Sequence, residues 1–298
     1  MRVGVDLGGT KCEAVVLGPD GHVRSRRRVP TPRGDYGQIL AAVAALVSDI
    51  SREVVLPDGA PIGVGIPGSV SPTTGLVRNA NTTELNGRPL DRDLAERLGR
   101  PVAVDNDANC FAVAEARQGA GRGHAMVFGV ILGTGVGAGI AIEGQARVGR
   151  NAIAGEWGHM PLPKPEDWER PGPRCYCGRF GCIETWISGP GLAQDHASAT
   201  GERLTAAEIA ACSSHLAPAA DSMARHLSRL ARGLAQVVNV LDPDIIVLGG
   251  GLSNIPGLAE RLESALVPHV FSDACQTPVR RHVLGDSAGV IGAAWLAS

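Results

Sequence analysis

Apolar runs that end in glycine mark the two halves of the chain in a similar way. The first run, 3–7, leads into a glycine-rich turn and is followed by the apolar residues 14–17. A later run, 128–132, also leads into a glycine-rich turn and is followed by 140–142. A strand, a tight turn and a returning strand produce this pattern. Both segments therefore predict a β-hairpin.

Each predicted hairpin is followed further along by another apolar strand that ends in glycine. These strands are 62–68 in the first half and 245–251 in the second half. A repeat of this length indicates a duplicated structural unit. We therefore expect an α/β protein made of two similar lobes with a cleft between them.

Helical periodicity fills the intervals between these strands. Segment 38–50 has apolar residues at the spacing of one helix face. Segment 107–117 begins at an acidic residue and ends before a glycine, which is typical of a helix. Segments 221–240 and 286–296 complete the predicted helices, while the proline-rich segment 161–173 is expected to be a loop.

Composition and charge exclude several classes of protein. The 298 residues are 44% hydrophobic and 19% charged, which is typical of a folded soluble protein. The net charge of −2 gives no electrostatic reason to expect nucleic acid or an anionic membrane as a partner. Segment 125–142 is uncharged and long, but its alternating glycines favour two buried strands over a membrane span. The seven cysteines and the absence of a secretory signal predict reduced thiols and a cytoplasmic location.

Three glycine turns follow predicted strands and are candidate phosphate sites. Glycine allows a phosphate to approach the main chain closely, so that consecutive N–H groups can bind it. An ordinary tight hairpin would need the same glycines, but three such turns together favour a nucleotide site. A returning strand follows the 133–139 turn, where a dinucleotide-binding fold would have a helix. The candidate nucleotide and Mg²⁺ residues are Asp6, Gly8, Gly9, Thr10, Lys11, Gly133, Thr134, Gly135, Gly137, Gly249, Gly250 and Gly251.

An acidic cluster lies where a short apolar strand, 102–104, meets the helix that begins at 107. Asp105, Asn106 and Asp107 stand at this junction. A carboxylate at a helix start can cap the helix, or it can accept a proton from a reacting hydroxyl. The local pattern leaves both roles open for Asp105 and Asp107.

Four potential zinc ligands gather in one part of the chain. Cys175, Cys177 and Cys182 lie close together, and His159 precedes them. Three thiolates and one imidazole form a set suited to tetrahedral Zn²⁺ with no open position, which predicts a structural zinc ion. Free or disulfide-bonded thiols are the alternative, and a cytosolic location argues against disulfides.

Six motifs stand out along the chain: DLGGTK at 6–11, GIPG at 65–68, DNDANC at 105–110, LGTGVGAG at 132–139, GEWGH at 155–159 and CYCGRFGCIET at 175–185. Together they resemble the ROK family of sugar kinases and repressors across essentially the whole chain. The resemblance implies an actin/hexokinase-like ATPase fold with two ribonuclease-H-like lobes and a cleft between them. It implies an N-terminal lobe, 1–118, onto which helix 286–298 packs back, and a larger lobe, 119–285, that carries the zinc loop.

The resemblance also implies an ATP- and Mg²⁺-dependent kinase, expected as a homodimer, that phosphorylates a hexose. Asp107 would be the catalytic base, while the role of Asp105 stays open. Phosphoryl transfer needs a group that accepts the hydroxyl proton as the oxygen attacks phosphorus in line. The candidate sugar-binding residues are Gly68, Asn79, Asn81, Asn106, Asp107, Glu156, His159 and Glu184.

Three alternatives concern the substrate and the class of protein. Segments 65–75 and 79–87 resemble family members that act on fructose and mannose, so we expect transfer to the 6-hydroxyl of fructose, then mannose and glucose. N-acetylglucosamine, N-acetylmannosamine or glucose as the main substrate is the alternative. A sugar-sensing regulator would carry a DNA-binding module ahead of the first strand, which here starts at residue 2. A non-catalytic actin-like ATPase would have no use for the cysteine cluster.

Overall fold

The computed structural model describes residues 1–57 and 59–296, which fall into two compact units. Within the described residues, the first unit contains Met1–Ala125, Gly139–Ala154 and 283–296. The second unit contains Met126–Ala138 and Gly155–His282. The predicted division at 118/119 therefore differs from the structure, because 139–154 belongs with the N-terminal part of the chain.

The first unit is built on a mixed sheet with the strand order β3-β2-β1-β4-β7. The pairs β1–β2 and β2–β3 are antiparallel, while β1, β4 and β7 run parallel. Parallel neighbours need crossover connections, which helices supply here. The elements are β1 Arg2–Leu7, β2 Lys11–Leu17, β3 Val23–Pro30, α1 Tyr36–Glu53, β4 Ile62–Ile66, β5 Ser69–Val70, β6 Val77–Arg78, α2 Leu90–Leu98, β7 Val102–Asn106, α3 Asp107–Gln118, β10 Gln145–Ala146 and α9 Ala288–Leu296.

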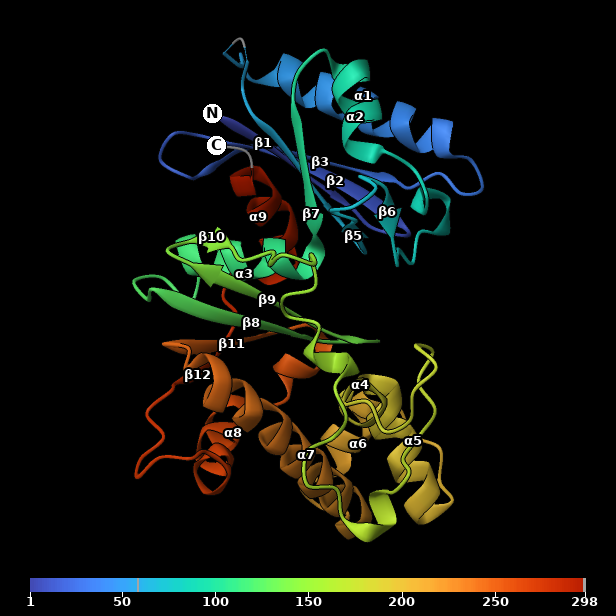
Figure 1. The fold of residues 1–298 in the computed structure, drawn as a ribbon, viewed down its shortest axis with the longest axis vertical. Coiled ribbons are helices and arrows are strands. Elements are labelled where there is room, and N and C mark those ends of the chain that lie inside the picture. The colour runs from blue at the N-terminus through green and yellow to red at the C-terminus, as the bar shows by residue number, and fades with distance from the viewer. Residues whose placement is uncertain (58, 297–298) are drawn as a thin grey trace. The chain divides into compact units, whose positions relative to one another are not determined.

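Helices cover both faces of this sheet. In Figure 1, α1 and α2 lie on one face, and α3 and α9 lie on the other. Helix α9 packs closely because glycines replace side chains at its contacts. A Cβ on Gly292 would lie 1.7 Å from the carbonyl oxygen of Cys110 in α3. A Cβ on Gly63 in β4 would lie 1.8 Å from the carbonyl oxygen of Ala293.

Replacing Gly292 with alanine should destabilise the protein strongly. The new methyl group would overlap a main-chain atom, so that α9 or α3 must move, and we expect a loss of about 3 kcal/mol or more. Gly37→Ala, at an exposed position of α1, is the control and should change the free energy of unfolding by less than about 1 kcal/mol. Urea unfolding of both variants measures the difference, and equal midpoints would contradict the packing described for α9.

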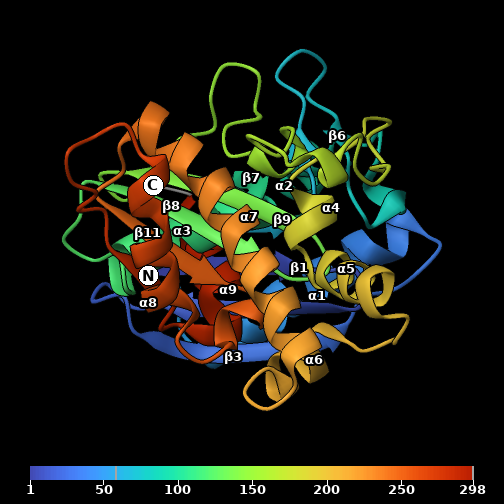
Figure 2. The ribbon, with the colours of Figure 1, turned by 90° about the horizontal axis from the view of Figure 1, so that it is seen from below.

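The second unit repeats the sheet arrangement. The sheet has the order β10-β9-β8-β11-β12, in which β8, β11 and β12 run parallel and β9 pairs antiparallel with β10. Its strands β8, β11 and β12 belong to the second unit, whereas β10 and the part of β9 from Gly139 onward belong to the first. Helix α7 lies across the lower face of this sheet with α8 beside it (Figure 2). The elements are β8 Met126–Leu132, β9 Val136–Ile142, α4 Glu184–Ile187, α5 Gly189–Thr200, α6 Ala206–Cys212, α7 Ala217–Leu241, β11 Ile245–Gly249, α8 Leu258–Leu266 and β12 Val279–Arg281.

The two sheets correspond strand for strand, as the sequence repeat predicts. Each begins with a hairpin, and in each the first strand of that hairpin pairs parallel with a later strand. Segment 125–142 forms the β8–β9 hairpin rather than a single helix. Within the described part of the chain, no helix combines the length and apolar character that a membrane span requires.

Candidate active site

Acidic residues of the first unit meet at the carboxyl ends of its parallel strands. Asp6 in β1 pairs in register with Gly65 in β4, which in turn pairs with Asp105 in β7. In open α/β sheets, ligands bind at this edge of the strands. The sheet therefore brings the first glycine turn and the 105–107 cluster to one edge.

Asp107 is the first residue of α3 and directly follows Asn106, the last residue of β7. Asn106 caps this helix, because its side chain accepts a hydrogen bond of 2.8 Å from the N–H of Ala108. Burial and the nearby charge of Asp6 raise the pKa of Asp107 from 3.8 to about 6. A carboxylate with this pKa is ionised at neutral pH and is a stronger proton acceptor than an ordinary aspartate.

The other two aspartates have different surroundings. Burial, together with the charge of Glu13, raises the pKa of Asp6 to about 6. Asp105 is engaged locally, since its Oδ1 accepts hydrogen bonds from the Asn106 N–H at 2.7 Å and from Asn109 Nδ2 at 2.8 Å. These contacts support a structural role for Asp105, which shapes the junction in front of Asp107.

The predicted sugar-binding residues of the first unit lie together. Asn106 Nδ2 donates a hydrogen bond of 3.1 Å to the carbonyl oxygen of Gly68. The N–H of Asn81 donates to the carbonyl oxygen of Pro67 at 3.1 Å. Asn79 has a φ of 56°, which turns the chain back toward this segment. Gly68, Asn79, Asn81 and Asn106 therefore belong to one local arrangement beside Asp107.

The first glycine turn connects β1 to β2. The N–H of Gly8 donates to the carbonyl oxygen of Lys11 at 3.0 Å, and Gly9 and Thr10 are exposed at the tip. Thr31, which the sequence analysis did not single out, holds the turn, because its hydroxyl donates to the carbonyl oxygen of Gly8 at 2.7 Å. The exposed tip leaves main-chain N–H groups available to a phosphate.

The second glycine turn is attached to the element that carries Glu184. The N–H of Val136 donates to Glu184 Oε2 at 2.9 Å, and the N–H of Gly189 donates to the carbonyl oxygen of Gly133 at 2.8 Å. A Cβ on Gly135 would lie 2.8 Å from Glu184 Oε2, so a side chain there would push the end of the Glu184 side chain away. One hydrogen bond thus joins Glu184, a predicted sugar-binding residue, to the 133–139 turn, a predicted phosphate site.

A cavity of about 1080 Å³ in the second unit lies between the second and third glycine turns. Gly250 has a φ of 78°, which turns the chain from β11 into a short 3₁₀ helix, Gly251–Asn254. The wall contributed by α6 consists of alanines, which suits a flat apolar group such as a nucleobase. The lining residues include Gly133, Thr134, Gly189, Ala206, Ala210, Gly251, Asn254 and Arg261.

The four predicted zinc ligands form a compact cluster. The ligand atoms of His159, Cys175, Cys177 and Cys182 all lie within 4.8 Å of one another. Cys175 Sγ is 3.5 Å from His159 Nδ1, and Cys177 Sγ is 3.6 Å from Cys182 Sγ. Ligands placed ~2.3 Å from a tetrahedral centre are themselves about 3.8 Å apart, so the donor set fits Zn²⁺. The sulfur separation is too long for a disulfide.

The elements around this cluster position Glu156 and Glu184. Glu156 precedes the 3₁₀ helix Trp157–His159, which the buried Trp157 ring anchors against Phe128 at 6.0 Å between ring centroids. The N–H of Ile183, the residue before Glu184, donates to the carbonyl oxygen of Met160 at 2.9 Å. The cluster therefore ties together the two segments that carry these carboxylates.

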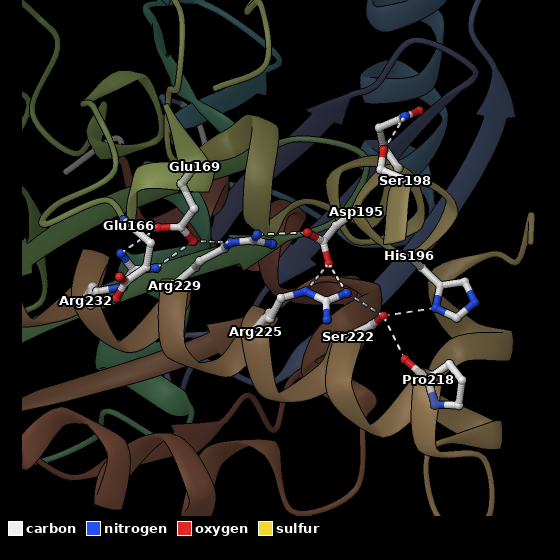
Figure 3. A network of polar contacts seen from close by, with 11 residues as sticks. Glu166, Glu169, Asp195, His196, Ser198, Pro218, Ser222, Arg225, Arg229 and Arg232 are labelled. Carbon is white, nitrogen blue, oxygen red and sulfur yellow. Dashed lines mark hydrogen bonds and ion pairs between the residues drawn. The ribbon is translucent and has the colours of Figure 1, made fainter. Parts of the chain in front are cut away.

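A buried ion network, which the sequence does not reveal, holds the 161–173 loop in place (Figure 3). Glu169 lies 2.8 Å from both Arg229 and Arg232 of α7. Asp195 of α5 lies 2.8 Å from Arg225 and from Arg229. Burial alone would raise the pKa of Glu169, but hydrogen bonds from Arg232 and Arg229 hold it below its ordinary value. The network fixes the loop that leads into the cysteine cluster.

Comparisons with known proteins identify the family. A model described as the ROK family matches residues 2–298. The chain is 38% identical over 305 residues to the N-acetyl-D-glucosamine kinase of Escherichia coli O6:H1, with 99% of each chain covered.

Solved structures give the same result. A ROK hexokinase from Thermus thermophilus has a TM-score of 0.89 and 33% identity, with 99% of this chain and 97% of that chain covered. A ROK family glucokinase from Streptomyces griseus, in complex with glucose and AMPPNP, has a TM-score of 0.78 and 31% identity, with 99% and 98% covered. These matches confirm the predicted actin/hexokinase-like fold.

The fold and these relatives define the protein as an ATP-dependent sugar kinase with a small-molecule sugar as its substrate. The chain belongs to the ROK family.

Proposed function

We propose that the protein transfers the γ-phosphate of ATP to the 6-hydroxyl of N-acetylglucosamine. The observation that carries this proposal is the 38% identity with an N-acetyl-D-glucosamine kinase along the full length of both chains. The preference for fructose and mannose expected from segments 65–75 and 79–87 finds no support among the relatives named above. The alternative left open by the sequence, an N-acetylhexosamine, is therefore the better proposal.

Asp107 supplies the proton acceptor in this proposal. With a pKa of about 6 it is still mostly ionised at neutral pH, and the raised pKa makes it a better acceptor for the proton of the sugar hydroxyl as phosphorus is attacked. Asn106, Gly68, Asn79 and Asn81 hold the sugar from the first unit. Glu156 and Glu184 are the proposed sugar contacts of the second unit, since a sugar ring needs several hydrogen-bonding partners at fixed angles. His159, the third residue predicted there, belongs first to the metal cluster.

The glycine turns bind the nucleotide in this proposal. Main-chain N–H groups at Gly9 and Thr10, assisted by Lys11, bind phosphate on the first unit, and those at Thr134 and Gly135 bind phosphate on the second. Gly8, Gly133 and Gly137 let the phosphates approach these turns closely. The turn at Gly249–Gly251 lies at the cavity that would take the nucleoside. Asp6 fits a Mg²⁺ ion that neutralises the transferred phosphate, since hard cations prefer carboxylate oxygens.

Zinc has a structural role in this proposal. His159, Cys175, Cys177 and Cys182 would hold it, and the full donor set leaves no position for a reacting water. These residues fix the loop in front of Glu184. A homodimer remains a prediction, which light scattering on the purified protein would test.

A panel of sugars tests the substrate proposal. We expect the highest kcat/KM for N-acetylglucosamine among N-acetylglucosamine, N-acetylmannosamine, glucose, mannose and fructose, measured through ADP release. A site that pairs the acetamido group discriminates against a sugar that lacks it by ~1–3 kcal/mol, or roughly 5- to 150-fold. A higher value for fructose or mannose would overturn this choice and leave the sugar kinase assignment in place.

Replacing Gly135 with alanine should weaken sugar binding more than nucleotide binding. The new methyl group displaces Glu184 from the N–H of Val136. Loss of a hydrogen bond to a carboxylate costs about 1.5 kcal/mol or more, which corresponds to a roughly tenfold higher KM for the sugar. Steady-state kinetics with each substrate varied in turn measures this change.

Gly133→Ala provides the contrast on the same turn. A Cβ there meets no protein atom within 4 Å, so the hydrogen bond of Glu184 stays intact. We expect a higher KM for ATP and little change in the KM for the sugar. If both variants change the KM for the sugar equally, the link between Glu184 and this turn has no role in sugar binding.

A further inference from the structure

Tyr176 lies between two of the cysteines in the cluster and makes a specific contact with the cluster histidine. Its side chain is 83% exposed, so burial does not explain its orientation. Its hydroxyl oxygen is 2.9 Å from His159 Nε2. The two rings meet edge to face, with centroids 5.1 Å apart and planes at 85°. A solvent-exposed tyrosine thus points back onto the imidazole.

The two nitrogens of His159 face different partners. Nδ1 lies 3.5 Å from Cys175 Sγ and therefore faces the thiol cluster, while Nε2 faces Tyr176. A metal on Nδ1 leaves the ring proton on Nε2, which then donates to the tyrosine oxygen. In zinc sites, a hydrogen bond to the second ring nitrogen fixes the tautomer and the ring orientation.

The loop geometry keeps Tyr176 in this place. Cys175 and Cys177, the residues on either side of it, are both cluster members, so a bound metal would hold the main chain at both ends. The N–H of Gly178 donates to the carbonyl oxygen of Cys175 at 3.0 Å and closes a tight turn around Tyr176. The hydroxyl and the imidazole therefore hold each other in place.

We propose that Tyr176 is a positioning residue that orients His159 Nδ1 toward the metal by accepting a hydrogen bond from Nε2–H. This inference rests on the zinc site proposed above. It also changes the role expected for His159. With Nδ1 facing the cysteines and Nε2 in contact with Tyr176, the principal role of His159 is to hold the metal.

Tyr176→Phe removes the hydroxyl and keeps the ring, so it isolates this hydrogen bond. Partners of this kind contribute roughly 10- to 100-fold to metal affinity, and at this exposed position we expect about a tenfold loss. Competition with a chromophoric zinc chelator measures the affinity. Cobalt substitution gives a second readout, since the visible absorption of Co²⁺ reports the orientation of its histidine ligand. Tyr36→Phe, which removes a hydroxyl bonded to Asp93 in the first unit, is the matched control and should bind zinc like the unmodified protein.

The outcomes separate this inference from the zinc site itself. If the unmodified protein binds zinc and Tyr176→Phe matches it in both affinity and cobalt spectrum, Tyr176 does not position His159 and the inference is wrong. If the unmodified protein binds no zinc, the zinc site and the inference both fail. Circular dichroism of Tyr176→Phe and Tyr176→Ala verifies that an affinity loss does not arise from unfolding.

Discussion

Replacing Asp107 with asparagine should lower kcat about 100-fold or more, because the amide keeps the size of the side chain and cannot accept the proton of the sugar hydroxyl. Sugar binding should change far less, since an amide still forms hydrogen bonds. Asp105→Asn is the neighbouring control. Its contacts with Asn106 and Asn109 are structural, so we expect its effect on kcat to be much smaller. Steady-state kinetics decides, and near-normal turnover of Asp107→Asn would show that another group is the base.

The pH profile gives independent information on the same carboxylate. A base works when deprotonated, and burial together with Asp6 raises the pKa of Asp107 from 3.8 to about 6. Activity should therefore be constant above roughly pH 7 and fall as the pH drops through about 6. This decline at acidic pH should be seen in kcat/KM for the sugar, measured at saturating ATP. A decline centred near pH 4 would mean that Asp107 has an ordinary pKa in the working enzyme.

Loss of a zinc ligand should also have a large effect, on both the zinc content and the activity of the protein. Protein purified without added zinc should contain about one equivalent per chain, and Cys182→Ser should lose most of it, because a three-ligand site binds zinc far more weakly. Glu184 follows Cys182 by two residues, so kcat/KM for the sugar should fall at least about tenfold. Elemental analysis and kinetics on the same preparations measure both effects.

Cys275→Ser is the matched control, because Cys275 lies outside the cluster and its loss should leave both zinc content and activity unchanged. Active unmodified protein with less than about half an equivalent of zinc would contradict the structural role.

Much of the fold was predictable because apolar runs and glycine turns act locally. The helix predicted at 38–50 is α1, Tyr36–Glu53, extended by the Asp35 side chain, which accepts from the N–H of Gln38. The helix predicted at 221–240 is α7, Ala217–Leu241, which starts earlier because Pro218 is tolerated in a first turn. Strand β3 was missed, since its charged sequence VRSRRRVP belongs to an exposed edge strand without an apolar run.

The candidate site was likewise predictable only in part. The three cysteines could be grouped with one another because their spacing suits a single metal ion, whereas Asp107 was singled out as the base only by the resemblance to the family. Contacts between distant segments could not be read from any local pattern. Glu169 and Arg229 are 60 positions apart, and Thr31 holds a turn 23 residues earlier. The sugar is equally hard to predict, because the carboxylates and amides that bind a hexose ring also bind its N-acetylated relatives.

The most direct test of the account follows phosphorus from ATP to sugar. Purified protein is incubated with Mg²⁺, ATP and N-acetylglucosamine, and the products are identified by ³¹P NMR and mass spectrometry, with Asp107→Asn run in parallel. We expect equal amounts of ADP and a sugar phosphorylated at its 6-hydroxyl, with strongly reduced formation of both by the variant. Unchanged ATP and no phosphorylated sugar, with N-acetylglucosamine and with each of the other sugars of the panel, would contradict it.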